Sequence, residues 1–446
     1  MNPVKVGNRQ VVIVGAGLVG SLLACYLGRR GYQVAVYERR SDPRVATAER
    51  GRSINLALSE RGLDALRRID LVDEVMGPAL PMHGRMMHGR DGTLSYQSYS
   101  ADGMRAINSI GRSALNESLL NAASRTPGVR LHFDAPVTKL DLGGSIATFE
   151  VSGRSRTVAY DALLGADGGG SAVRKVLVDA GITKVTEDIL QTGYKELQIP
   201  PVDGDFALDP DALHIWPRGG SMMIALPNPD RSFTCTLFWP KEDLTALSTP
   251  AAITEHFMDE YPDAVPLMPT LVDDYLHNPI GMLGTIHADR WHAHGNVGLI
   301  GDAAHAILPF FGQGANCGFE DVVELDRCLE ETGDDWAAAL PRYQERRRVN
   351  AEAIAQLAKE NFVEMRDKVN SKAFLVTKQL EHALERALPG TYLSRYEMVS
   401  FTTIPYAEVI ERDSRQRRFV IAGLAAVGVS VLALAVGAAR RAGQRS

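Results

Sequence analysis

The chain has 446 residues, of which 45% are hydrophobic, 7% aromatic and 23% charged, and its net charge is -6. These proportions are those of a globular protein and exclude disordered, collagen-like and disulfide-scaffold classes. The negative net charge leaves no global basic field for nucleic acid, so we expect no nucleic-acid partner. The four cysteines lie far apart without CxxC spacing, so the sequence predicts neither a zinc site nor a disulfide framework.

The first 40 residues predict a strand, a helix and a second strand. Residues 11–14 are a continuous apolar run, as in a strand buried on both faces. Residues 18–30 carry apolar side chains at helical spacing, and residues 33–37 are β-rich. Glycines interrupt the apolar stretch 11–27, so we do not interpret it as a signal peptide.

A glycine motif joins the first strand to the helix. Gly15, Gly17 and Gly20 form GxGxxG, which permits a tight turn, close approach of a pyrophosphate and close helix packing. Glu38 follows the second strand, where a carboxylate accepts hydrogen bonds from ribose hydroxyls. The pattern predicts a dinucleotide site at the N-terminus of the helix.

The remaining chain predicts two further kinds of structure. We expect a helix at 113–123, a buried strand at 160–164 and a second buried strand at 296–300, followed by helices to about residue 387. Between the two strands lie short β-like runs separated by turns, at residues 213–216, 222–226 and 233–238. These runs indicate a second domain built on a different sheet.

Two later motifs follow predicted strands. Gly165–Gly168 contains Asp-Gly, with Ser171 and Arg174 after it, and Gly301–His305 contains Gly-Asp. Together with GxGxxG they resemble flavoprotein hydroxylases of the para-hydroxybenzoate hydroxylase type. The resemblance implies that Asp302 binds the ribityl chain of FAD.

Five segments extend the resemblance to the kynurenine 3-monooxygenase family, namely residues 51–59, 213–218, 222–227, 232–238 and 309–314. The similarity runs from about residue 10 to about residue 410. It implies a NADPH- and FAD-dependent monooxygenase that converts L-kynurenine to 3-hydroxy-L-kynurenine in tryptophan degradation. Oxygen is activated in this family as a flavin C4a-hydroperoxide, NADPH visits transiently, and no metal is required.

The substrate is an amino acid whose carboxylate needs a partner. Arg85 offers a planar bidentate fork, and Tyr99 adds a hydroxyl donor. By resemblance, Asn361 and Tyr396 complete the substrate pocket from the helical segment.

The family also indicates where FAD is held. Arg112 falls where these hydroxylases place an arginine over the cofactor, and Ala315 and Asn316 would present backbone amides to the flavin pyrimidine edge. The full set of expected cofactor positions is Gly15, Gly17, Val19, Gly20, Tyr37, Glu38, Arg39, Arg40, Ala57, Arg112, Val137, Asp302, Ala315 and Asn316.

The predicted fold class is α/β, with a Rossmann-type FAD-binding domain, a second β-sheet substrate domain, a C-terminal helical segment and a C-terminal membrane helix. We assign residues 1–80, 105–190 and 285–345 to the first domain, 81–104 and 191–284 to the second, 346–410 to the helical segment and 419–439 to the membrane helix.

The membrane prediction rests on 21 uncharged residues, 419–439, a length that spans about 30 Å as a helix. More arginines precede the segment than follow it, which favours a catalytic body on the cytoplasmic side. The membrane would be the outer mitochondrial membrane in a eukaryote or the inner membrane in a bacterium. A hydrophobic packing helix is the alternative.

Two other functions remain open from the sequence. One is a quinone-ring hydroxylase of the same superfamily, which would not need Arg85 and Tyr99 together for a carboxylate. The other is a membrane-tethered flavoprotein that binds FAD without turnover. The sequence does not indicate which oligomeric state the protein has.

Overall fold

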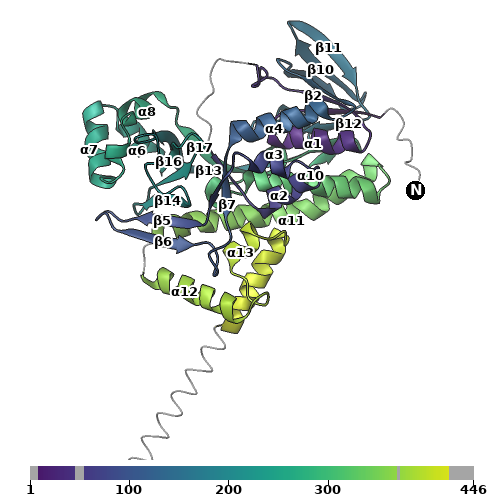
Figure 1. The fold of residues 1–446 in the computed structure, drawn as a ribbon. Helices are drawn as coiled ribbons and strands as arrows, with labels where there is room; N and C mark the ends of the chain where they lie inside the picture. Colours follow the sequence, from purple (N-terminus) through teal and green to yellow (C-terminus); the bar gives the residue numbers. More distant parts are fainter. Residues whose placement is uncertain (1–8, 46–54, 369–371, 421–446) are drawn as a thin grey trace, which may run out of the picture.

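The computed structural model describes residues 9–45, 55–368 and 372–420. Figure 1 shows two lobes, each built on a sheet, with the C-terminal helices packed below them. One lobe holds the first strands of the chain, and the other holds the long strands from the middle of the chain.

The first lobe contains a six-stranded sheet with the order β18-β19-β12-β1-β2-β8. All its neighbours pair in parallel except β18 and β19, so the N-terminal strand lies in the middle of the sheet. The strands are β1 (Gln10–Val14), β2 (Gln33–Tyr37), β8 (Val129–His132), β12 (Ala162–Gly165), β18 (His292–Ala293) and β19 (Val297–Leu299). The buried apolar runs predicted around β1, β2, β12 and β19 are confirmed as strands.

Helices cover this sheet and complete its hydrophobic core. Helix α1 packs against α4 and α10, as expected when apolar stripes face one another. The helices of this lobe are α1 (Leu18–Arg29), α2 (Glu60–Arg67), α3 (Val72–Met76), α4 (Arg112–Arg125), α5 (Ala172–Asp179), α9 (Asp302–His305) and α10 (Gly314–Glu331). The helix predicted at 113–123 is therefore confirmed as α4.

Two three-stranded sheets flank the first lobe. One has the order β11-β10-β9 and the other β3-β7-β4. Their strands are β9 (Val137–Asp141), β10 (Ile146–Val151), β11 (Arg154–Ala159), β3 (Asn55–Leu58), β4 (Leu80–Met82) and β7 (Ile107–Gly111). Residues 51–54 of the motif that begins at residue 51 lie outside the described residues.

The second lobe contains a seven-stranded sheet with the order β17-β13-β16-β15-β14-β5-β6. Its pairs are antiparallel except β14 with β5. The strands are β5 (Gly84–His88), β6 (Leu94–Ser98), β13 (Val185–Ile199), β14 (Ala212–Pro217), β15 (Met222–Pro227), β16 (Phe233–Pro240) and β17 (Gly281–Ala288). The three β-like runs predicted from the sequence are β14, β15 and β16.

Side chains alternate between the two faces of the second sheet, and each face packs against a different set of helices. On β15, Met223 packs toward the helices of this lobe, whereas Met222 packs toward the C-terminal helices. The covering helices on the first side are α6 (Lys241–Ala246), α7 (Pro250–Glu260), the 3₁₀ turn η1 (Val265–Leu267) and α8 (Leu271–His277).

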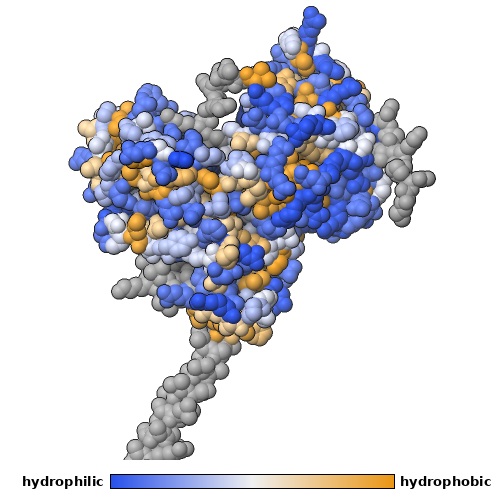
Figure 2. Space-filling model, viewed as in Figure 1, coloured by the Kyte–Doolittle hydropathy of each residue, from blue (hydrophilic) through white to orange (hydrophobic). Residues whose placement is uncertain are grey.

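The C-terminal part is helical, as the sequence predicts. After the 3₁₀ turn η2 (Pro309–Phe311) come α10, α11 (Trp336–Val363), the π-helical turn η3 (Glu364–Lys368), α12 (Lys372–Ala387) and α13 (Arg395–Ser400). A last helical stretch covers residues 406–420. On the face shown in Figure 2, hydrophilic residues predominate over both lobes and hydrophobic residues gather in smaller patches.

The predicted C-terminal membrane helix is the part of the fold class that has to be corrected. Among residues 9–45, 55–368 and 372–420, no helix is long and apolar enough to cross a membrane. The two longest described helices, α10 and α11, carry charged side chains along their length, which a bilayer core disfavours. Of the expected span 419–439, only residues 419 and 420 are described, at the end of a charged helical stretch.

Candidate functional site

One cavity of about 700 Å³ connects the two lobes. At one end it is lined by the turn between β1 and α1, and at the other by side chains of the second sheet and of α13. Clefts between domains that are largely apolar and carry a few convergent polar groups are the usual ligand sites of enzymes. The two ends differ in their chemistry.

The glycine turn forms the first end. Gly15 has φ of +102°, and a Cβ there would lie 2.6 Å from the carbonyl oxygen of Ala166, so only glycine fits. Its N–H donates to the Tyr37 carbonyl at 2.8 Å. A Cβ on Gly20 would overlap the Gly15 backbone, whereas the Cβ position of Gly17 is open space. The turn is therefore compact behind and open in front, where α1 presents its first amides.

The end of β2 supplies a fixed carboxylate. Glu38 accepts hydrogen bonds from the backbone N–H of Ala16 at 2.8 Å and of Arg40 at 3.0 Å. The ring of Tyr37 stacks on Phe149 at 3.7 Å, so its side chain belongs to the core. Tyr37 therefore offers its backbone to the cavity, and the exposed Arg39 lines the same wall.

The Asp-Gly motif forms another part of the cavity wall, and hydrogen bonds within the motif hold it in place. The Asp167 carboxylate accepts from the Ser171 hydroxyl at 2.6 Å and from the Ala172 N–H at 2.6 Å, at the start of α5. Arg174 donates to the Ala303 carbonyl at 2.9 Å and so joins the Asp-Gly motif to the Gly-Asp motif. The two motifs are one structural unit.

Asp302 faces the cavity from the first turn of α9. Burial raises the pKa of its carboxyl above the usual value of 3.8, while the charges of His305 and Arg112 act in the opposite direction. Arg112 begins α4 and lines the same cavity. Asp302 is exposed to the open cavity, and a carboxylate beside an arginine there suits a ligand that carries both hydroxyl groups and negative charge.

The N-terminus of α10 completes the first end of the cavity, where the sequence predicts the cofactor and which we call the cofactor end. Ala315 lines the cavity, as do Val19, Ala57 and Val137. The Asn316 side chain does not reach the cavity, because its amide donates to the Ala57 carbonyl at 2.8 Å. Its oxygen accepts the Ser59 N–H at 3.0 Å. Asn316 thus joins α10 to β3 through its side chain. Only its backbone amide is left to serve a ligand at the start of the helix.

The second end is built around a buried arginine. Arg85 on β5 is 8% exposed, and its guanidinium carbon lies 4.7 Å from the Tyr396 ring centre and 5.6 Å from that of Tyr99. The two tyrosine rings stack at 4.9 Å. Burial opposes the charge, but the Tyr396 and Tyr99 hydroxyls favour it, and the pKa of Arg85 is raised. Its Nε is buried without a partner, so the site has an unused donor for an anion.

Asn361 lies behind this pocket. Its amide nitrogen donates to the Phe310 carbonyl at 2.7 Å and approaches the Met365 sulfur at 3.3 Å. Phe310, Phe311 and Met365 themselves line the cavity. In this arrangement Asn361 contacts the pocket through the residues that it supports.

The sequence indicated Phe310 and Phe311 as an apolar wall of the pocket, but not the larger part of the wall. It comes from alternate residues of the second sheet and includes Leu213, Met222, Ile224, Leu226, Thr236 and Phe238. The alternation along these strands was visible, but which face met the cavity depended on the packing of the two lobes.

The comparisons with known proteins agree with this geometry. The family model described as an FAD binding domain matches residues 8–358. The kynurenine 3-monooxygenase of Myxococcus xanthus (strain DK1622) is 46% identical over 402 residues, which cover 89% of this chain and 86% of the relative. The chain belongs to the kynurenine 3-monooxygenase family. A eukaryotic member of this family, from Dictyostelium discoideum, is 42% identical over 416 residues, or 90% of each chain.

Solved structures show the same fold for this kynurenine 3-monooxygenase family member. The tetrameric form of 2-methyl-3-hydroxypyridine-5-carboxylic acid oxygenase has a TM-score of 0.67 at 22% identity and covers 84% of this chain and 96% of its own. PqsL of P. aeruginosa, in complex with 2-aminobenzoylacetate, has a TM-score of 0.66 at 23% identity and covers 81% and 97%.

The cofactor of the family fits the residues described above. The open front of the glycine turn leaves room for a pyrophosphate, the carboxylates of Glu38 and Asp302 stand at its two sides, and the start of α10 lies beyond them. The residues at this end of the cavity therefore fit FAD, the cofactor that the family model names.

Proposed function

We propose that this chain hydroxylates L-kynurenine at ring carbon 3, with FAD as bound cofactor and NADPH and oxygen as co-substrates. The observation that carries the proposal is the buried Arg85, which lines the same cavity as the proposed FAD site and has a donor, Nε, without a partner. An amino-acid substrate supplies the carboxylate that such a guanidinium binds in a bidentate manner. The kynurenine 3-monooxygenases of the comparison support this choice of amino acid.

The roles of the cofactor-end residues follow from their chemistry. Gly17 and the first turn of α1 receive the pyrophosphate, Glu38 accepts from ribose hydroxyls, and Asp302 accepts from the ribityl chain. Amides at the start of α10, at Ala315 and Asn316, stabilise negative charge on the flavin ring. When bound, FAD would take electrons from NADPH and activate molecular oxygen, of which one atom is transferred to the substrate ring and the other leaves as water.

The substrate end has the tasks of holding the ring in place and excluding water. Arg85 pairs with the carboxylate, and the hydroxyls of Tyr99 and Tyr396 surround the same charge. The aromatic wall of Phe238 and Phe310, whose rings lie 5.0 Å apart, packs against the substrate ring and keeps water out.

The proposal is tested by NADPH oxidation with purified FAD-loaded protein, with and without L-kynurenine, while the product mass is measured. We expect strong stimulation and a gain of one oxygen atom. Oxidation that kynurenine does not affect, with hydrogen peroxide as the only product, would contradict the proposal and favour a different ring substrate or a silent flavoprotein.

The Arg85→Ala variant tests the pocket itself. Removing a buried charge partner costs about 2 to 5 kcal/mol, so the KM for kynurenine should rise about 30-fold or more while FAD remains bound. The flavin absorbance of the purified variant checks the second half of this expectation. An unchanged KM would show that Arg85 does not bind the substrate.

A further inference from the structure

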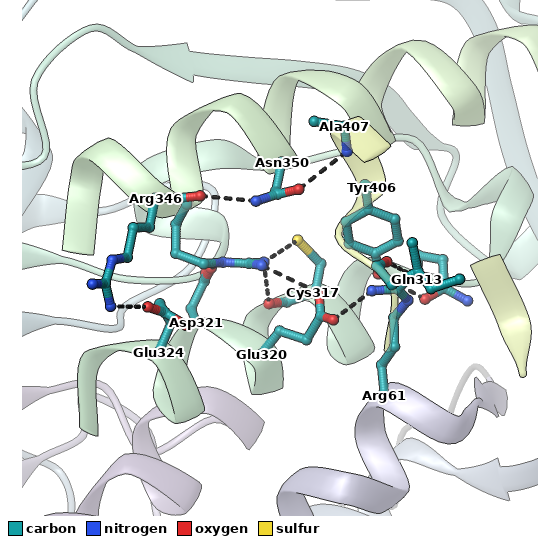
Figure 3. Close-up of polar contacts among 12 residues, drawn as sticks. Arg61, Gln313, Cys317, Glu320, Asp321, Glu324, Arg346, Asn350, Tyr406 and Ala407 are labelled. Carbon is teal, nitrogen blue, oxygen red and sulfur yellow. Dashed lines mark hydrogen bonds and ion pairs between the residues drawn. The ribbon is translucent and has the colours of Figure 1, made fainter. Parts of the chain in front are cut away.

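A second arginine, Arg61 on α2, is buried away from the cavity and forms the centre of a polar network (Figure 3). Its side chain has no exposed surface. Nη1 donates to Glu320 Oε1 at 2.5 Å, and Nε donates to the Val399 carbonyl at 2.9 Å. The guanidinium carbon lies 3.9 Å from the Tyr406 ring centre. The whole cation is therefore surrounded by specific partners.

Apart from Glu320, the partners of Arg61 belong to residues 398–406, which follow Tyr396 in the chain. Nη2 of Arg61 donates to the Met398 carbonyl at 3.3 Å and to the Ile404 carbonyl. Met398 and Val399 lie in the last turn of α13, where carbonyl groups lack partners within a helix. Arg61 supplies the partner of the Val399 carbonyl from a different part of the fold. At the Met398 carbonyl it adds to the Thr402 hydroxyl, which donates there at 2.6 Å.

Helix α13 also carries Tyr396, whose ring stacks on Tyr99 and lies over Arg85. The helix spans only six residues, so a shift at its last turn is transmitted to Tyr396 within one turn. At its other end Arg395 pairs with Asp413 at 2.7 Å and with Glu360 of α11 at 2.5 Å. Arg61, by contrast, ties the last turn of α13 to α2 of the first lobe.

A further contact of residues 398–406 reaches Gln313, in the loop before α10. The Tyr406 hydroxyl donates to Gln313 Oε1 at 2.9 Å, and Gln313 immediately precedes the first turn of α10. Because Arg61 packs against the Tyr406 ring, it also supports this contact.

The network continues from Arg61 to the Gly-Asp motif. Glu320 accepts from Arg347 at 3.2 Å, and Arg347 donates to Asp321 at 2.7 Å. Asp321 accepts the Gly301 N–H at 3.1 Å and contacts His305 at 2.6 Å. Burial opposes ionisation of Asp321, but His305 and Arg347 lower its pKa, so the chain of alternating charges is kept. Arg61 therefore connects α13 to a rigid part of the cofactor site.

We propose that Arg61 is a positioning residue for substrate binding, which fixes Tyr396 and the Gln313 loop by holding the segment 398–406 against α2 and α10. The proposal rests on the function proposed above. Four N–H groups in a planar fork are required for these bonds, and a lysine ammonium has three donors in a different geometry.

The Arg61→Lys variant of the full FAD-loaded chain tests this role. We expect the KM for kynurenine to rise about 10-fold, with a larger share of NADPH oxidised without product, while FAD affinity and kcat change about twofold or less. The matched control is Arg68→Lys at the C-cap of the same helix, where Arg68 lies 2.9 Å from its partner Asp64 and has a side chain that is 48% exposed. The control should behave as wild type. A KM and a product yield equal to wild type in Arg61→Lys would overturn the proposal.

Tyr406→Phe provides a milder variant, because it removes one hydroxyl and keeps the ring under Arg61. We expect a KM increase of about threefold and no loss of folding. A rise in kcat/KM for kynurenine would contradict the positioning role.

Hydrogen exchange gives a readout that does not depend on turnover. In the FAD-loaded protein, peptides covering residues 395–405 should exchange about 10-fold faster in Arg61→Lys than in wild type or Arg68→Lys. Unchanged exchange there overturns the proposal. If the wild-type protein were not stimulated by kynurenine, the proposed function would fail, but the exchange result would still decide whether Arg61 holds this segment.

Discussion

The two ends of the cavity recognise their ligands by different means. At the cofactor end, much of the surface is backbone from short stretches of chain, residues 15–20 and 37–40, with a carboxylate on either side. At the substrate end, side chains form the binding surface, and Arg85, Tyr99 and Tyr396 come from three separate segments. The cofactor end is local in its glycine turn and Glu38, which are close together in the sequence, although the fold adds Arg112, Asp302 and Ala315 to them. The substrate end is assembled entirely by the fold.

This difference explains why the cofactor end is legible as a motif. A backbone that must adopt a positive φ or approach a ligand closely requires glycine, and the requirement fixes residue types at fixed spacing. A guanidinium between two rings requires only that three distant segments meet. No spacing rule in the sequence expresses that requirement.

Breaking the local end should have the largest effect. In Gly15→Val, the positive φ and the clash with the Ala166 carbonyl oxygen should weaken FAD binding by about 100-fold or more. Flavin content after purification and titration of the apoprotein with FAD measure the loss. Gly31→Val is the matched control, because Gly31 has φ of +88° but nothing within 4 Å of its Cβ position. Equal loss of FAD in both variants would mean that general strain, rather than the turn, is responsible.

Asp302→Asn should separate binding from stability at the same end. FAD affinity should fall about 10-fold, because a charged acceptor is replaced by a neutral one. The raised pKa of Asp302 means that ionising its carboxyl lowers the stability of the flavin-free protein. This destabilisation is absent below pH 3.8, grows as pH rises through the raised pKa, and is constant above it.

The flavin-free Asp302→Asn variant should therefore have a higher Tm than wild type at neutral pH and an equal one in acid. Thermal unfolding of both apoproteins across this pH range measures the difference. A wild-type apoprotein that is the more stable at neutral pH would contradict the predicted sign.

At the assembled end, single hydroxyl deletions should have the smallest effects. Tyr99→Phe and Tyr396→Phe should each raise the KM for kynurenine about fivefold and leave FAD bound. Since the rings stack at 4.9 Å beside Arg85, the double variant should lose less than the product of the two. Steady-state KM values for the three variants test this. Strictly multiplicative losses would show that the two hydroxyls act independently.

The fold was largely predictable, because buried parallel strands appear as apolar runs and turns as glycines. Strands β1, β2, β12 and β19 and helix α4 were expected close to their observed bounds. The membrane helix was the error: the segment 419–439 was judged by its apolar length alone, and no described helix meets the requirement. A run of uncharged residues does not by itself determine where it packs.

The site was less predictable at the level of side chains. The ring of Tyr37 packs in the core although the residue lines the cavity, and the side chain of Asn316 joins α10 to β3, which leaves it the backbone amide that was expected to serve the cofactor. The sequence offers no sign of Arg61, because its partner Glu320 lies 259 residues away. Such contacts are decided by packing between elements, which local patterns do not encode.

The central position of β1 in its sheet also has a consequence for synthesis of the chain. This strand pairs directly with β2 and β12, and β19 extends the same sheet beyond β12, so the sheet around the glycine turn is complete only when residue 299 has emerged. Tyr396 follows about 360 residues after Glu38, an interval of about 20 to 70 s at 5–20 residues per second. Until residue 299 has emerged the nascent chain carries apolar strands that lack a neighbour, and the substrate pocket is complete only after Tyr396 has followed.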